Sequence, residues 1–409
     1  MQAVGVIAEF NPFHMGHAWL LGEIRRRFGE DCAIVCAMSG NYTQRGDCAI
    51  LRKHVRAEAA VRSGADLVLE IPLPWAISSA EGFASGGVQV LAAAGVVDAL
   101  AFGSECADTS MLMRTAEALL SERFQDALRE ELDAGDSFAS ARQRAAETVG
   151  GGDAWVLSAP NDILGVEYCK SLRQADSPME PLAIARIGAS HDGAPVDGVA
   201  SASYIRRLLI AGQGAEEYLA PEMSVLYEKE RAAGRAPVEL LTLERAVLAR
   251  LRGMGEEEFA SYDEGGEGLY HRFFAASRSC LSIEELLNTV KTKRYAHARL
   301  RRMLLAVFLG LRPGDRPEHI PYIRVLAMND KGKCLLHRMR GSAVLPVLIK
   351  PASVRRLSDM ALQLFQAEAR ATDLYALAYP SLSESAGGGE WSIGPVQVQM
   401  LETDLSRRA

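Results

Sequence analysis

The chain lacks the features of a secreted, membrane-spanning or repetitive protein. Its seven cysteines are irregularly spaced and form no Cys-x-x-Cys pair, so neither disulfides nor a zinc site is expected. No uncharged window approaches about eighteen apolar residues, and no basic segment precedes the apolar run near the N-terminus. There are no internal repeats. We therefore expect a cytoplasmic protein with no signal peptide and no membrane partner.

The composition is that of a globular protein with a sizeable core. Of 409 residues, 48% are hydrophobic and 24% are charged, which is enough for two or three domains. The net charge of −7 argues against indiscriminate nucleic-acid binding, although a local basic patch remains compatible with it. No metal ligands are predicted.

Two histidines bracket a glycine close to the N-terminus. His14-Met15-Gly16-His17 follows an apolar run at residues 4–8, and the segment after it has helical spacing. The rings would then lie at a helix N-terminus, where backbone N–H groups favour anions, so phosphate is the expected ligand. The alternative is a turn whose histidines are merely surface polar groups.

A second candidate phosphate site lies far downstream. Ser201 and Ser203 can cap the helix that begins beside them, and Arg206 in its first turns can reach a triphosphate. Taken alone, this segment is an ordinary capped helix. Together with His14 and His17, it favours a nucleotide site.

The first half of the chain alternates strand and helix patterns. Apolar runs typical of buried parallel strands alternate with amphipathic segments, which predicts an α/β doubly wound parallel sheet with its ligand at the carboxyl ends of the strands. The expected strands are residues 4–8, 33–38, 67–71, 99–102 and 183–187, and the expected helices include 53–63, 80–94 and 111–120. The polar residues Arg45, Asn161 and Arg186 lie near these strand ends or in nearby loops, although Asn161 or Asp162 could simply cap a helix at 163–172. Gly103 follows the fourth strand, where the missing side chain would let a nucleotide base or ribose approach.

Three domains are predicted along the chain. We expect residues 1–210 to form the nucleotide-binding domain, and residues 211–315 have a helical pattern. Residues 316–409 form a small α/β unit, with strands near 325–327 and 344–349, helices at 332–340 and 353–375, and a polar tail that we expect to be mobile at 383–389.

A basic segment in the helical region is the candidate RNA surface. An apolar stripe behind it indicates a docked helix with its basic side outward, and Tyr295 could stack on a base. The residues concerned are Lys291, Lys293, Arg294, Arg299 and Arg302. The alternative is a solvated helix face.

Separated motifs in a fixed order resemble the tRNA(Met) cytidine acetate ligase family, within the superfamily of HxGH nucleotidyltransferases. The matching segments are residues 8–17, 39–41, 44–46, 79–84, 102–105, 161–168, 186–189, 200–202 and 291–295, so the resemblance covers most of the chain. Phe10, Met15 and the lead into Asn161 depart from the family pattern. The resemblance implies a HIGH-type, Rossmann-like nucleotidyltransferase domain.

The resemblance also implies an activity. ATP, accompanied by Mg²⁺ in the usual way of triphosphates, would activate acetate as acetyl-adenylate, and the acetyl group would pass to N4 of the wobble cytidine of elongator tRNA(Met). His14 and His17 would be catalytic and would neutralise the phosphates as pyrophosphate leaves. The expected ATP contacts are Ile7, Ala8, Glu9, Phe10, Asn11, Pro12, Phe13, His14, Met15, Gly16, His17, Ala18, Trp19, Leu20, Gly103, Asn161 and Arg186, together with Ser201, Ser203 and Arg206 from the second signal.

Two other functions remain open at this stage. A small-molecule nucleotidyltransferase of cofactor synthesis would share both phosphate signals, but usually needs only one domain. A non-catalytic RNA-binding protein could retain the fold with its histidines as relics. The long helical region argues against the first, and the intact histidine motif with Arg206 argues against the second.

Overall fold

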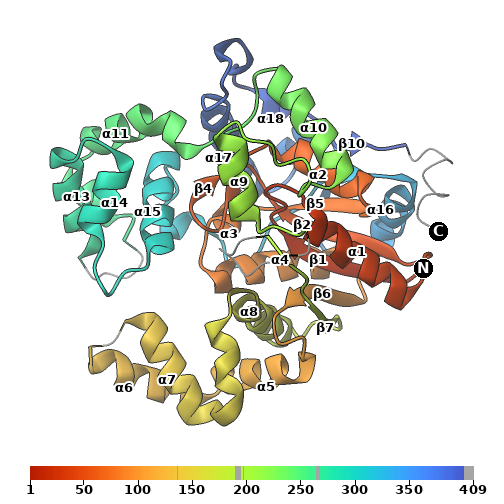
Figure 1. Cartoon of the computed structure of the whole chain (residues 1–409), viewed down its shortest axis with the longest axis horizontal. Coiled ribbons are helices and arrows are strands. Elements are labelled where there is room, and N and C mark those ends of the chain that lie inside the picture. The colour runs from red at the N-terminus through yellow and green to blue at the C-terminus, as the bar shows by residue number, and fades with distance from the viewer. Residues whose placement is uncertain (136, 189–194, 197, 264–267, 400–409) are drawn as a thin grey trace.

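A single mixed sheet organises the protein (Figure 1). The computed structural model describes residues 1–135, 137–188, 195–196, 198–263 and 268–399. The strands of the sheet are β1 (Ala3–Ala8), β2 (Ala33–Ser39), β5 (Leu67–Ile71), β6 (Ala99–Ser104), β7 (Glu180–Ala185), β8 (Ile323–Met328), β9 (Val347–Leu348) and β10 (Val396–Gln397). A separate short hairpin consists of β3 (Tyr42–Thr43) and β4 (Asp47–Cys48).

The strand order creates a crevice beside β1. The sheet runs β10-β8-β5-β2-β1-β6-β7, with β9 paired to β8, and β5, β2, β1, β6 and β7 are parallel. After β1 the chain builds β2 and β5 on one side, then crosses to build β6 and β7 on the other. Ligands of doubly wound sheets bind at such a reversal, outside the carboxyl ends of the strands.

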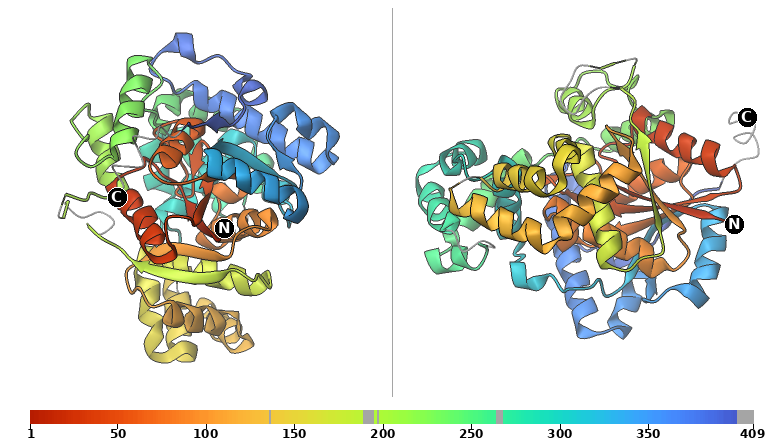
Figure 2. Two further views of the ribbon diagram at one scale, coloured as in Figure 1. Left: turned by 90° about the vertical axis from the view of Figure 1, so that its right-hand side faces the viewer. Right: turned by 90° about the horizontal axis from the view of Figure 1, so that it is seen from below.

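Helices cover both faces of the sheet because successive side chains of a strand point to opposite sides (Figure 2). On β1, Val4 and Val6 pack on one face, while Ala3 and Ile7 pack on the other. The first face is covered by α1 (Met15–Phe28), α2 (Lys53–Arg62), α9 (Ala202–Ile210) and α10 (Pro221–Ala232). The second is covered by α4 (Ala80–Ala94), α5 (Thr109–Leu120), α8 (Pro160–Gln174), α16 (Asp330–Ser342) and α17 (Asp359–Ala376).

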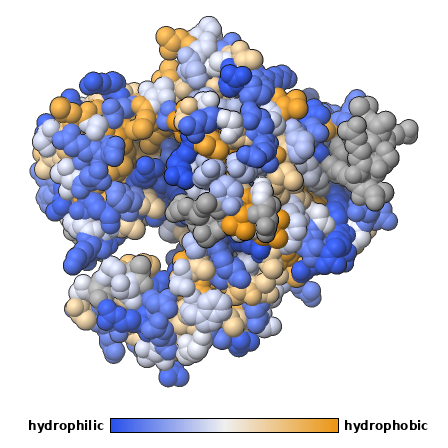
Figure 3. Space-filling model, in the orientation of Figure 1, coloured by the Kyte–Doolittle hydropathy of each residue, from blue (hydrophilic) through white to orange (hydrophobic). Residues whose placement is uncertain are grey.

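Two helical lobes project from this body (Figure 1). One contains α6 (Glu122–Asp133) and α7 (Phe138–Gly150). The other has an apolar core that it shares with residues of β3, β4 and α17, and it contains α11 (Glu244–Gly253), α12 (Glu256–Ala260), α13 (Leu269–Ser279), α14 (Ile283–Val290) and α15 (His297–Leu309). The space-filling view shows a notch in the molecular outline between the two lobes (Figure 3).

The predicted strands and helices of the first half are close to the observed ones. The parallel α/β sheet is confirmed, and the run expected at 183–187 lies earlier, at Glu180–Ala185, so that Arg186 directly follows the strand. The helix expected at 353–375 is interrupted: a 3₁₀ turn at Pro351–Arg356 precedes α17. The sequence patterns did not indicate α6 or α7.

The C-terminal region does not form a second sheet. β8 pairs antiparallel with β5, and β10 pairs with β8, so residues beyond 316 extend the sheet of the first domain. α10 likewise packs against α2, although the predicted boundary at residue 211 assigned it to the helical region. The segment at 383–389 begins within a 3₁₀ turn at Leu382–Glu384 and ends at the first residue of the short helix α18 (Gly389–Ser392).

All seven cysteines are free thiols. Within the part of the chain that the structure describes, no helix is both long and apolar enough to cross a bilayer.

Candidate active site

A cavity of about 260 Å³ opens at the carboxyl ends of β1 and β6. Most of the residues predicted to contact ATP line this cavity, and they come from both sides of the point at which the strand order reverses. Those residues are Ile7, Ala8, Glu9, Phe10, Asn11, His14, Gly16, His17, Trp19, Leu20, Gly103, Asn161, Arg186, Ser201, Ser203 and Arg206. Four predicted contacts do not line the cavity, namely Pro12, Phe13, Met15 and Ala18. Pro12 and Phe13 are buried in the protein, whereas Met15 has 38% of its surface exposed.

The two histidines build the start of α1. His14 is the N-cap, and its Nδ1 accepts a hydrogen bond from the Gly16 N–H at 3.1 Å. In return, the His14 N–H donates to His17 Nδ1 at 3.3 Å, and the two rings stack with their centroids 3.8 Å apart. Because each Nδ1 accepts a hydrogen bond, the neutral rings carry their own proton on Nε2. Each ring thus keeps one N–H donor for a ligand.

Tight backbone packing holds this turn in place. Phe10 has a φ of 47°, a left-handed conformation that is uncommon for a bulky residue, and its ring packs against Phe13 at 4.9 Å and His17 at 5.0 Å. A Cβ atom on Gly16 would lie 3.0 Å from Cε1 of His14. The glycine of the motif is therefore needed to admit the capping ring, besides any close approach of phosphate.

The histidines are neutral in this setting. Burial lowers the pKa of His14 to about 3, and the charges of Arg186 and Arg206 act in the same direction. Burial also lowers the pKa of His17, with smaller effects from His14 and Arg186. In the protein alone the two rings therefore offer neutral hydrogen bonds, and the positive charge of the cavity comes from arginines. Neutralisation of phosphate charge by the two rings stays a prediction, since a bound phosphate would raise both pKa values.

Ser201 and Arg206 connect α9 to the histidine turn. Ser201 is the N-cap and its hydroxyl accepts from the Tyr204 N–H at 3.2 Å, whereas Ser203 lies inside the helix, 3.1 Å from the Ser201 hydroxyl. Only Ser201 is therefore a cap. Arg206 donates a hydrogen bond to the Asn11 carbonyl at 2.7 Å, which holds its guanidinium beside the turn that leads from β1 to His14.

Gly103, Asn161 and Arg186 meet on the opposite side of the cavity. A Cβ on Gly103 would lie 3.2 Å from Cγ of Arg186, so the missing side chain makes room for that arginine. Asn161 does not cap α8, whose N-cap is Ala159; its amide instead donates to Glu105 at 2.5 Å. The Asp162 carboxylate accepts from the Ser104 hydroxyl at 2.5 Å, which ties α8 to the end of β6.

Several residues at the cavity were not among the predicted contacts. They include Gln44, Arg45 and Tyr168 in its lining. Arg56 was also missed, since an arginine inside an amphipathic helix is usually a surface residue. It is fully buried, and its guanidinium donates to the carbonyls of Glu9, Ser39 and Gly40, which fixes the ends of β1 and β2 side by side. The polar loop after the second strand was the available signal for Gln44 and Arg45.

The basic segment differs from its prediction in two ways. Lys291, Lys293 and Arg294 precede α15 instead of lying on it. Tyr295 is buried, with the Arg299 guanidinium 5.2 Å from its ring centre, so the tyrosine offers no stacking surface for a base.

The start of α15 contacts the loop at the cavity mouth. Arg302 donates to the Gln44 carbonyl at 3.3 Å, and Arg301 pairs with Asp47 at 3.1 Å. Gly46 has a φ of 76°, and a Cβ there would lie 2.5 Å from the Arg302 nitrogen. The basic segment and the cavity are thus joined through one short loop.

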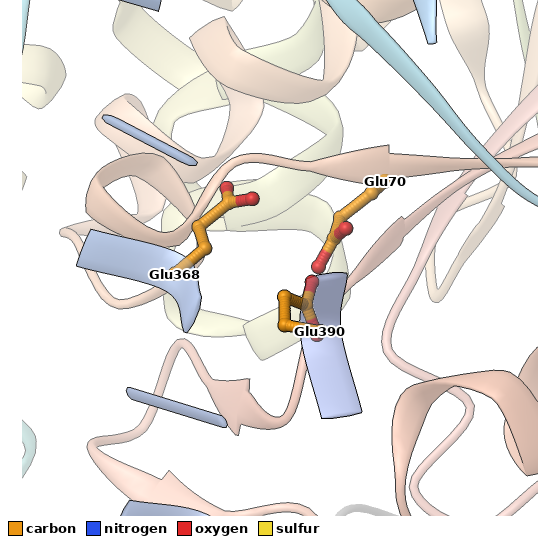
Figure 4. A group of neighbouring side chains, drawn as sticks. All are labelled: Glu70, Glu368 and Glu390. Carbon is orange, nitrogen blue, oxygen red and sulfur yellow. The ribbon is translucent and has the colours of Figure 1, made fainter. Parts of the chain in front are cut away.

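A second buried polar cluster lies away from this cavity. Glu70, Glu368 and Glu390 bring three carboxylates together within reach of one metal ion (Figure 4). Lys53 already pairs with Glu70 at 2.6 Å and with Glu390, and Arg324 pairs with Glu390. These cations occupy the positions around the acids, so the cluster fits a network of ion pairs and not a metal centre.

Comparison with known proteins places these features in context. The family model described as HIGH Nucleotidyl Transferase matches residues 1–389. The tRNA(Met) cytidine acetate ligase of Acetivibrio thermocellus is 35% identical, over 96% of this chain and 99% of the relative. The enzyme of the same name from Syntrophomonas wolfei is 33% identical, over 97% and 99%.

Solved structures show the same similarity. A crystal structure of Thermotoga maritima TmcAL bound with alpha-thio ATP superimposes with a TM-score of 0.91 and 32% identity, covering 98% of this chain and 100% of that one. An apo form of the same protein gives a TM-score of 0.92.

Proposed function

Because the chain belongs to the HIGH nucleotidyltransferase family, and within it to the tRNA(Met) cytidine acetate ligases, we propose that it acetylates N4 of the wobble cytidine of elongator tRNA(Met). ATP and acetate would first form acetyl-adenylate and pyrophosphate. The acetyl group would then pass to the cytidine, giving N4-acetylcytidine and AMP. This reaction would take place in the cytoplasm, where the tRNA is.

One observation carries the proposal. His14, His17, Arg186 and Arg206 come from segments far apart in sequence and line one cavity at the reversal of strand order. An excess of fixed donors and positive charge suits a triphosphate, and displacement at phosphorus depends chiefly on positioning and charge stabilisation. The histidine Nε2–H groups would donate to phosphate oxygens, while the arginines would stabilise the charge that moves onto pyrophosphate.

Mg²⁺ fits this site as a companion of ATP. Among the described residues that line the cavity, Glu9 is the only carboxylate, so the protein offers no cage of oxygen ligands. Mg²⁺ at nucleotide sites is commonly held by substrate phosphates and water with few protein ligands. When bound, the ion would offset phosphate charge and the residues above would orient the α-phosphate toward acetate.

The tRNA would approach along the basic segment at the start of α15. Lys291, Lys293, Arg294, Arg299 and Arg302 are the proposed contacts, and Arg302 also holds the loop at the cavity mouth. An anticodon loop presents unstacked bases, which single-strand RNA readers can take into a pocket. Contact with the RNA backbone would then set the cytidine over the cavity.

Two measurements test the proposal. Exchange of labelled pyrophosphate into ATP should depend on acetate, and labelled acetate should appear in N4-acetylcytidine when the protein, ATP and elongator tRNA(Met) are incubated together. Exchange that requires a different small substrate would instead support a nucleotidyltransferase of cofactor synthesis. No exchange, with retained tRNA binding, would support a non-catalytic RNA-binding protein.

A further inference from the structure

The second half of the proposed reaction needs a proton acceptor. The N4 amine of cytidine is a weak nucleophile and becomes positively charged as it bonds to the acetyl carbon. A base within hydrogen-bond reach of that nitrogen would remove the proton as the bond forms, an effect typically worth about 10²–10⁴ in rate. This inference therefore rests on the proposed function.

Few groups in the cavity could accept that proton. Nδ1 of His14 and Nδ1 of His17 already accept backbone N–H groups, which directs the Nε2–H of each ring outward as a donor. Tyr168 is buried, and burial raises the pKa of its hydroxyl, which keeps it protonated. Glu9 is the remaining acidic side chain among the described lining residues.

Contacts from α2 and from the loop after β3 place Glu9. It directly follows β1, and its backbone carbonyl is held by the buried Arg56. Its Oε1 accepts from the Gln44 N–H at 2.7 Å. Among the described residues, no donor reaches Oε2, so one carboxylate oxygen is fixed and the other is available to a ligand.

Glu9 also lies on the side of the cavity from which the RNA would come. The Gln44 N–H that binds Glu9 and the Gln44 carbonyl that accepts from Arg302 belong to the same residue. A single residue thus separates the carboxylate from the proposed RNA surface. The phosphate donors His14 and His17 lie instead at the start of α1.

We propose that Glu9 is the catalytic base of acetyl transfer. Its Oε2 accepts a proton from N4 while N4 forms a bond to the acetyl carbonyl carbon. The bond between that carbon and the phosphate oxygen of AMP breaks, and AMP leaves with the electron pair. The products are N4-acetylcytidine, AMP and a protonated Glu9, which returns its proton to water.

The surroundings of Glu9 suit this role. Burial raises the pKa of its carboxyl group above the ordinary value, while the Gln44 N–H and the charges of Arg206, Arg56 and Arg45 act in the opposite direction. The charged and titratable groups that face it thus come from α9, α2 and the loop after β3, with Tyr168 on α8. A base with a raised pKa accepts a proton more readily.

The test separates the two chemical steps in a Glu9→Gln variant. The amide keeps a carbonyl oxygen for the Gln44 N–H but cannot take up a proton. Single-turnover transfer of labelled acetyl to tRNA should fall by about 100-fold or more, whereas acetate-dependent pyrophosphate exchange, to which Glu9 could contribute only as an ATP contact, should fall far less. Glu117→Gln, the same change in an exposed ion pair with Arg173, should alter neither measurement.

The dependence of the acetyl-transfer rate on pH distinguishes a catalytic role of Glu9 from a structural one. Transfer by the wild type should rise with pH as Glu9 ionises and then level off, and the Glu9→Gln profile should lack that rise. Wild-type transfer rates in Glu9→Gln would overturn the assignment. An equal loss of exchange and transfer would also overturn it, since Glu9 would then serve ATP, its metal ion or the loop. Absence of acetate-dependent exchange in the wild type would instead refute the proposed function itself.

Discussion

The two buried polar regions of this protein differ in how their charges are balanced. In the cluster around Glu70, Glu368 and Glu390, Lys53 and Arg324 lie directly on the acids. The cavity beside β1 has the opposite character, with lining charges Arg45, Arg186 and Arg206 against Glu9 alone. Buried charges are costly unless paired, so the paired cluster indicates a structural role. Arg45 and Arg186 are exposed, and the positive lining of the cavity suits an anionic ligand.

The two regions also join different parts of the chain. The paired cluster links α2 and β5 to β8, α17 and α18, so it ties the C-terminal residues onto the N-terminal sheet. The cavity links β1, α1, β6 and α9 around open space. We therefore expect substitutions in the first region to act on stability and substitutions in the second to act on catalysis.

Lys53→Met should produce the largest effect. Removing one partner from a buried ion pair leaves uncompensated charge, so the free energy of unfolding should fall by about 3–5 kcal/mol. Denaturant unfolding measures the change. Arg129→Met, which removes an exposed ion pair with Asp126, should leave the midpoint unchanged.

A double variant checks that the loss comes from pairing. Adding Glu390→Gln to Lys53→Met should recover part of the lost stability, since it removes a charge that no longer has one of its cations. Strictly additive losses would show that the two side chains contribute independently, which would contradict the interpretation of this region as one ionic network.

His17→Asn should mainly affect catalysis. The asparagine oxygen can still accept from the His14 N–H, but the ring donor is lost. Removing one donor to developing charge commonly costs about 10²–10³ in rate, so acetate-dependent pyrophosphate exchange should fall by that factor. Binding of tRNA, measured by filter retention, should hardly change. Parallel losses of exchange, tRNA binding and stability would make the histidine a structural residue.

Glu368→Gln should change how stability depends on pH. Burial and the charge of Glu70 raise the pKa of Glu368 to about 7, despite the opposing charges of Lys53 and Arg324. A carboxyl group whose pKa is raised by folding contributes stability that is complete below its pKa in the unfolded protein. This stability is lost as the pH rises through its pKa in the folded protein. Between pH 6 and pH 8, the free energy of unfolding of the wild type should therefore fall by about 1 kcal/mol more than that of the variant. Identical pH profiles of unfolding would contradict the shift.

Charge removal in the basic segment should have the smallest effect per residue. Removing one interaction with an RNA phosphate, as in Lys293→Gln, should weaken tRNA binding modestly and reduce the slope of log affinity against log salt by about one. Lys333→Gln on α16, an exposed residue paired with Asp330, is the matched control. Unchanged affinity after combined substitution of Arg294, Arg299 and Arg302 would remove this segment from the RNA surface.

Local patterns predicted much of the fold and of the cavity. The apolar runs located the parallel strands, and the histidine motif with Arg206 pointed to one ligand because short motifs encode local chemistry. The antiparallel pairing of β8 with β5 could not be predicted, since it joins residues more than 250 positions apart. The burial of Tyr295 and Arg56 was equally hidden, because it depends on neighbours from other elements.

Gly46 has a consequence for how the protein can vary. Its α carbon packs against the backbone of α15 with no space for any side chain, so the loop and the helix meet in a way that repacking of side chains cannot relax. A displacement of the start of that helix would also move Gln44, and it would thereby change the hydrogen bond between Gln44 and Glu9. Any displacement of the helical lobe would therefore be transmitted through Gln44 to the mouth of the nucleotide cavity.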